Sequence, residues 1–114
     1  MTRKLLLLPA LAAAGAATIV IAPAESATSV KIGDNYFVRP SGVPVVTVSK
    51  GAKVTWRWTG RSLHNVHVTK GPVKFASSSK TSGTFSKTVR KRGTYTIVCT
   101  IHGGSDQKMK LKVV

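Results

Sequence analysis

Short runs of alternating apolar and polar residues recur through the chain after residue 27. The clearest is Val54–Trp58, in which Val54, Trp56 and Trp58 fall on one face of an extended chain. A two-residue period fits a strand with one buried face and does not fit a helix. Gly, Pro, Ser and Asn separate these runs, as turn-forming residues do between strands. The pattern therefore predicts an all-β fold.

The expected strands form a single domain. In chain order they are 30–32 continuing into 35–38, 45–48, 54–58, 63–69, 73–76, 84–89, 94–99 and 109–113. Seven to eight short strands at this spacing predict an antiparallel β-sandwich with Greek-key connections. In the last strand, Met109, Leu111 and Val113 are expected to face the core. No internal repeat and no second domain is expected.

The N-terminal segment, residues 1–27, has the order of a secretory signal peptide. Two basic residues precede the apolar run 5–21, and small residues follow it, with cleavage expected after Ala24 or Ser26. The mature domain is then residues 28–114. Because the run is longer than the about 7–15 residues of a usual signal core and approaches a span of ~20, an uncleaved anchor is the alternative. We expect export to the periplasm, the cell surface or the medium.

The mature domain is strongly basic. From Thr28 onward the chain has 16 Lys and Arg residues and only two acidic residues, Asp34 and Asp106. Its net charge is therefore about +14. Such a charge attracts an acidic partner protein or an anionic cell surface, and its self-repulsion favours a monomer. Nucleic acid is not expected as a partner, because the export signal argues against it and no zinc-finger spacing, helix-turn-helix or basic helix is present.

Cys99 is the only cysteine, so it cannot form a disulfide within the chain. His102 follows three residues later, and Gly103 and Gly104 permit a tight turn that would bring both side chains to one point. A second histidine, His64, comes from another expected strand. One thiolate and two imidazoles with a weak axial ligand form the donor set of blue copper sites. A cysteine that is only a buried core residue is the alternative.

Four segments together resemble a known family. They are the paired strands around a glycine turn in Val45–Trp56, the segment Leu63–Val66, the lead-in Gly93–Tyr95 with Cys99-x-x-His102, and the closing strand. In this order they resemble the cupredoxins, small blue copper proteins of the plastocyanin, pseudoazurin and amicyanin type. Each segment alone is weak, since Cys-x-x-His is common, but their combination covers nearly all of residues 28–114.

The resemblance implies a single copper ion that alternates between Cu(I) and Cu(II). His64, Cys99 and His102 match the three strong ligands, and His102 matches the partly exposed histidine through which electrons pass. Asn65 matches a residue that hydrogen-bonds across to the cysteine loop and steadies the site. His67 has no counterpart in the family, and strand parity places it on the opposite face from His64, at the surface.

The axial ligand is where the chain departs from the family, which usually has a methionine soon after the second histidine. Here Gln107 lies five residues after His102, and Met109 lies seven after it. If Leu111 and Val113 are the inward pair of the last strand, family spacing gives Gln107 as the axial ligand and Met109 as a core residue. A longer loop with Met109 as the ligand is the rival. A glutamine oxygen, harder than a thioether, would favour Cu(II).

These features favour an electron carrier rather than an enzyme, because protein ligands nearly close the metal's coordination shell and catalysis needs an open position. Two other functions remain open. One is copper storage or delivery by the same ligands. The other is a cationic cell-surface β-domain that binds no copper.

Overall fold

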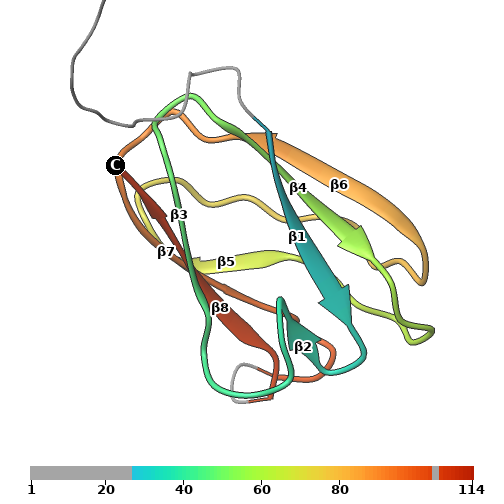
Figure 1. Cartoon of the computed structure of the whole chain (residues 1–114). Helices are drawn as coiled ribbons and strands as arrows, with labels where there is room; N and C mark the ends of the chain where they lie inside the picture. The colour runs from blue at the N-terminus through green and yellow to red at the C-terminus, as the bar shows by residue number, and fades with distance from the viewer. Residues whose placement is uncertain (1–26, 104–105) are drawn as a thin grey trace, which may run out of the picture.

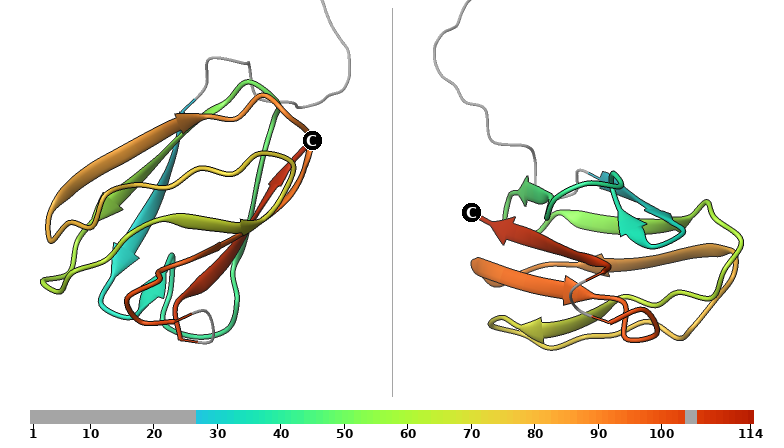
Figure 2. Two further views of the ribbon diagram at one scale, coloured as in Figure 1. Left: turned by 180° about the vertical axis from the view of Figure 1, so that it is seen from behind. Right: turned by 90° about the horizontal axis from the view of Figure 1, so that it is seen from below.

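Two four-stranded sheets packed face to face make up the part of the chain that the computed structural model describes, residues 27–103 and 106–114 (Figure 1, Figure 2). One sheet has the order β2-β1-β4-β6 and the other the order β3-β8-β7-β5. The strands are β1 (Ala27–Gly33), β2 (Tyr36–Phe37), β3 (Val45–Val48), β4 (Lys53–Trp58), β5 (His67–Lys70), β6 (Gly83–Thr88), β7 (Gly93–Val98) and β8 (Lys108–Val113). The predicted all-β sandwich is confirmed, with eight strands.

The alternation in the sequence places one face of each central strand in the core. In β4, Val54, Trp56 and Trp58 are buried, and in β8, Met109 and Leu111 are fully buried. The residues between them face outward or lie at the edge of the core. Each large apolar side chain that is fully buried stabilises the fold by about 1.5–3 kcal/mol relative to leaving it in water.

Two of the strand pairs are parallel, so the expectation of a purely antiparallel sandwich is wrong. β1 pairs with β4 in parallel, and β3 pairs with β8 in parallel. The chain passes into the second sheet at β3 and returns to the first at β4. A strand that returns by such a crossover can run in either direction, whereas a tight hairpin forces its two strands to be antiparallel.

Three boundaries differ from the predicted strands. Tyr36–Phe37 does not continue β1 but folds back on it as an antiparallel hairpin, because Asp34 and Asn35 form a turn in which Asn35 has a φ of 71°. Segment 73–76 is not a strand, although its last residue makes an isolated bridge to β5. The strand expected at 63–69 begins only at residue 67. The predicted signal peptide lies outside the described residues except for Ala27, which begins β1.

Several connections meet at the end of the sandwich opposite the C-terminus. The turn between β1 and β2 and the loop that joins β7 to β8 both lie at the lower end of Figure 1, while Val114 lies at the upper left. Because Val98 pairs with Lys108, the described residues between them, 99–103 and 106–107, also lie at that end. This arrangement brings segments far apart in the sequence to one place.

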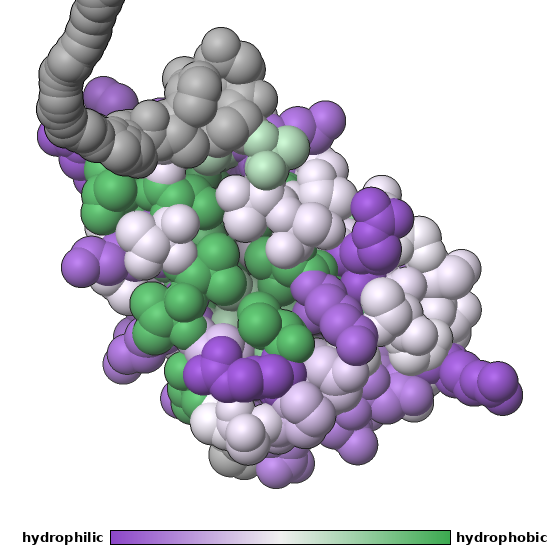
Figure 3. Space-filling model, viewed as in Figure 1, coloured by the Kyte–Doolittle hydropathy of each residue, from purple (hydrophilic) through white to green (hydrophobic). Residues whose placement is uncertain are grey.

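One face of the molecule mixes apolar and charged side chains. Figure 3 shows hydrophobic residues gathered near β3, where Val45 is 58% exposed, with hydrophilic residues around them. Within the described residues, no helix has the length and apolar character to cross a membrane.

Candidate metal centre

His64 lies in the connection between β4 and β5, and its ring is fully buried. Its backbone N–H donates to the Lys80 carbonyl at 2.9 Å, and its own carbonyl accepts from the Lys80 N–H at 2.9 Å and from the Trp58 indole at 3.2 Å. Hydrogen bonds to Lys80 and Trp58 therefore fix the main chain at His64, independently of its side-chain contacts. A buried imidazole with a fixed backbone is well placed to serve as a metal ligand.

The cysteine loop folds back on itself directly after β7. Cys99 is fully buried, and its carbonyl accepts a hydrogen bond from the Gly103 N–H at 3.0 Å. Gly103 has a φ of 83°, a conformation that glycine adopts without steric penalty. The expected tight turn is thus present at Gly103, whereas Gly104 lies outside the described residues. The turn places the Cys99 Sγ 3.4 Å from the His102 Nδ1.

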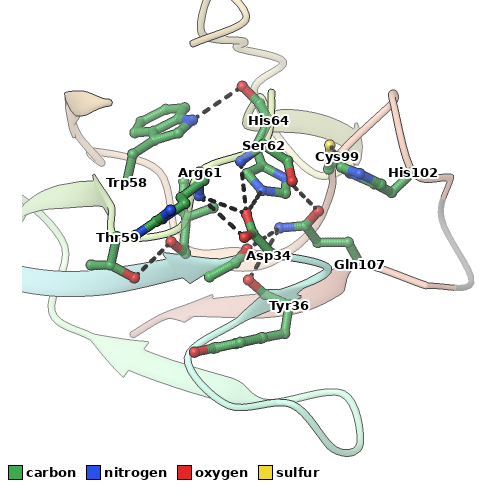
Figure 4. Close-up of polar contacts among 12 residues, drawn as sticks. Asp34, Tyr36, Trp58, Thr59, Arg61, Ser62, His64, Cys99, His102 and Gln107 are labelled. Atoms are coloured by element: carbon green, nitrogen blue, oxygen red, sulfur yellow. Dashed lines mark hydrogen bonds and ion pairs between the residues drawn. The ribbon is translucent and has the colours of Figure 1, made fainter. Parts of the chain in front are cut away.

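The three predicted metal ligands converge. One donor atom from each of His64, Cys99 and His102 lies within 4.8 Å of the others. The two imidazole rings are 4.7 Å apart between centroids (Figure 4). His64 and Cys99 are buried, while His102 is partly exposed. One ion at this point would have two donors shielded from water and one close to the surface.

Asn65 links the His64 segment to the cysteine loop. Its side-chain Nδ2 donates to the Thr100 hydroxyl at 2.8 Å, and its Oδ1 accepts from the Thr100 backbone N–H at 2.8 Å. These paired bonds join two segments that each carry a predicted ligand. His67 lies outside the cluster: it begins β5, opposite Val98, and is half-buried.

Gln107 lies beside the cluster, and its amide has a defined orientation. The side chain is fully buried, and its Nε2 donates to the carbonyls of Tyr36 at 3.1 Å and Gly33 at 3.4 Å. Because both neighbours on that side are acceptors, the NH₂ group must face them and the oxygen must face the other way. Oε1 accordingly lies 3.0 Å from His64 Nδ1.

Met109, the rival axial candidate, packs in the hydrophobic core. It lies in β8 opposite Ile97 and is fully buried among apolar side chains. Figure 4 shows the side chain of Gln107, from the loop before β8, pointing toward His64.

Asp34 contacts the centre, and the sequence reasoning did not identify it. Its Oδ1 lies 2.9 Å from His64 Nε2, and it also accepts from the backbone N–H groups of Arg61 and Ser62, each at 3.0 Å. Hydrogen bonds from the His64 ring, then from Ser62 and Arg61, hold the pKa of this carboxyl well below its ordinary value. A carboxylate at this place accepts hydrogen bonds, so Nε2 is the ring nitrogen placed to donate to it, while Nδ1 lies 3.0 Å from the Gln107 oxygen. Thirty residues separate the pair, and no local pattern connects them.

An all-β sandwich in which one thiolate and two imidazoles converge at one end belongs to a recognisable class, the β-sandwich copper proteins, since these donors form the blue copper set. The model of the copper-binding proteins of the plastocyanin/azurin family matches residues 24–114. The chain therefore belongs to this family, and the resemblance read from its sequence is confirmed. The family binds copper, and the cluster of His64, Cys99 and His102 fits a single copper ion.

Solved structures agree with this assignment. An oxidized proline-to-glycine variant of amicyanin is 25% identical, with a TM-score of 0.60 over 83% of this chain and 97% of that one. A methionine-to-alanine variant of amicyanin in its Cu(I) form is 27% identical, with a TM-score of 0.62 over 79% and 84%. A copper-containing nitrite reductase from Thermus scotoductus, 21% identical, shares the fold over 90% of this chain and 24% of its own, with a TM-score of 0.62. No curated protein sequence matches significantly.

Proposed function

We propose that this protein is an exported carrier of single electrons. Its one copper ion would be bound by His64, Cys99 and His102, with the Gln107 oxygen as the weak axial ligand. The observation that carries the proposal is the convergence of the three strong donors within 4.8 Å at one end of the sandwich. A bound copper ion supplies a one-electron couple between Cu(I) and Cu(II), and the protein supplies a fixed donor set that suits both states.

The orientation of the Gln107 amide supports its axial role. Backbone carbonyls of Gly33 and Tyr36 hold the NH₂ group, so the oxygen is the atom presented to the cluster. Met109 has no such access because it is packed in the core. An amide oxygen is a harder donor than a thioether and favours Cu(II), so the reduction potential should be low for this family.

Electron transfer fits this site better than catalysis does. His64, Cys99 and Gln107 are all fully buried, so a substrate would find no vacant side of the ion on which to bind. His102 is partly exposed and is flanked in the chain by Ile101, which is 44% exposed. An exposed ligand with apolar surface beside it provides a short route for an electron to a docked partner.

The remaining features concern the setting in which the protein works. The predicted signal peptide favours export, and the net charge of +15 for the whole chain favours an acidic redox partner and association with anionic surfaces. Electron-transfer contacts of this kind are small and short-lived, often below about 1,200 Å².

The decisive experiment is an optical spectrum of the purified protein after addition of Cu(II), compared with the Cys99→Ser variant. We expect an intense blue band from thiolate-to-copper charge transfer in the wild type and none in the variant, because the hydroxyl cannot replace the thiolate. Met109→Leu serves as a matched control for substitution of a buried residue. A folded wild-type protein without the band would refute the proposal. A blue protein that passes its copper rapidly to an apo-acceptor, without redox cycling, would instead indicate copper delivery.

A further inference from the structure

The far side of the His64 ring faces a carboxylate. One ring nitrogen, Nδ1, is directed toward the cluster and Gln107, and the other, Nε2, lies 2.9 Å from Asp34 Oδ1 (Figure 4). The ring is fully buried, whereas the Asp34 side chain is 41% exposed at the surface. The contact thus joins a buried predicted ligand to one of only two acids in the described residues.

The segment before His64 is shaped to hold this carboxylate. The backbone N–H groups of Arg61 and Ser62 donate to Asp34 Oδ1, and Gly60 packs directly against it. A Cβ at position 60 would lie 2.2 Å from Oδ1 and 2.9 Å from the Asp34 backbone nitrogen, so only glycine leaves room. Thr59 further ties the segment to β1, because its N–H and hydroxyl both donate to the Ile32 carbonyl.

We propose that Asp34 is a positioning residue that also sets the reduction potential of the copper centre. By accepting the Nε2 proton it fixes the tautomer of His64, so that the Nδ1 lone pair is available to the metal. Its negative charge raises the basicity of the ring and stabilises Cu(II), the more positive state, relative to Cu(I). The part of this inference that concerns the reduction potential rests on the proposed function, because it requires His64 to bind copper.

The geometry of Asp34 allows the effect of its negative charge to be tested separately from the effect of its hydrogen bonds. The contacts to His64 and Ser62 and the shorter contact to Arg61 are all made by Oδ1, and Oδ2 adds only a 3.1 Å contact to Arg61. Asp34→Asn can keep Oδ1 in place while it removes the charge. Asp106→Asn is the matched control, since it makes the same change in net charge at the exposed acid of the cysteine loop.

The first test is the reduction potential of the copper-loaded protein, measured by voltammetry. We expect Asp34→Asn to keep the blue band and to shift the Cu(I)/Cu(II) ratio at a fixed potential at least tenfold toward Cu(I), a rise of about 59 mV for one electron. Asp106→Asn should shift the ratio by much less. An unchanged potential in a blue Asp34→Asn protein, or an equal shift in both variants, would overturn the role of Asp34 in setting the potential.

The second test uses metal-free protein and so does not depend on copper binding. Nitrogen-15 NMR of the His64 ring should show a proton on Nε2 in the wild type and in Asp34→Asn, with or without a second proton on Nδ1 toward the Gln107 oxygen. In Asp34→Ala the proton should shift toward Nδ1, because only the Gln107 oxygen remains to accept it. A proton confined to Nδ1 in the wild type, or an unchanged ring in Asp34→Ala, would overturn the positioning role. If the wild type never turns blue, the proposed function fails, and the tautomer result still decides whether Asp34 orients His64.

Discussion

At the scale of single residues, the choice between Gln107 and Met109 has a measurable consequence. In Gln107→Met a soft thioether would replace the amide oxygen, so the blue band should persist and the reduction potential should rise. The same change removes the two hydrogen bonds from Gln107 Nε2 to the Gly33 and Tyr36 carbonyls, which should reduce the free energy of unfolding by about 1–3 kcal/mol. Voltammetry and urea denaturation measure the two effects.

Met109→Leu is the matched control for that substitution. A volume-conserving change in a core usually costs less than about 1.5 kcal/mol, and it should leave the potential unchanged because Met109 packs among apolar side chains. The reverse pattern, a potential that follows position 109 and ignores position 107, would show that Met109 is the axial ligand.

The candidate site could be predicted from the sequence only where the chemistry is local or patterned. Cys99 and His102 are three residues apart before a glycine, and His64 precedes Asn65 in a recognisable segment. Asp34 shows no such pattern, because its contact with His64 depends on how β1 and the segment after β4 come together in the first sheet. A contact across thirty residues becomes visible only once the strand pairing is known.

At the scale of elements, the β1–β2 hairpin supports the centre from one side. Its two-residue turn consists of Asp34, which contacts His64, and Asn35, and the residues on either side provide both carbonyls that hold Gln107. Asn35 has a φ of 71°, a left-handed conformation that asparagine and glycine tolerate better than other residues. The geometry of this turn therefore helps to position both His64 and Gln107.

Substitution of Asn35 tests this dependence on backbone conformation. Asn35→Ala should lower the free energy of unfolding by about 1 kcal/mol, because alanine pays a steric penalty in the left-handed region. Asn35→Gly should be close to neutral, since glycine adopts that conformation readily. Urea denaturation of the metal-free protein measures both changes. An equal loss in the two variants would mean that the asparagine side chain, and not its φ, matters.

The same hairpin shows why parts of the fold escaped prediction. Strands with clean alternation, such as Lys53–Trp58 and Lys108–Val113, are predicted to within a residue because burial of one face dictates their period. The apolar run after Asn35 predicts a continuation of the first strand, although Gly-Asp-Asn is a typical turn sequence. The parallel pairing of β1 with β4 could not be predicted, because periodicity reports which face is buried and not which strand lies alongside.

At the scale of the whole molecule, the net charge of +15 should govern how fast small redox reagents reach the end that carries the predicted copper ligands. A field of this sign attracts anions and repels cations, and salt weakens both effects because the Debye length falls from about 10 Å at 0.1 M to about 3 Å at 1 M. Two small oxidants of opposite charge, hexacyanoferrate(III) and tris(phenanthroline)cobalt(III), isolate this effect without a natural partner.

Stopped-flow oxidation of the Cu(I) protein should be fast with the anionic reagent and slow with the cationic one at low salt. Rising ionic strength should reduce the first rate constant by about tenfold and increase the second, because screening removes attraction in one case and repulsion in the other. Asp106→Asn, which removes a negative charge from the cysteine loop, should steepen both trends. Rate constants that do not change with ionic strength for either reagent would mean that the net charge does not affect electron transfer through His102. The proposal of an acidic redox partner would then lose the observation on which it rests.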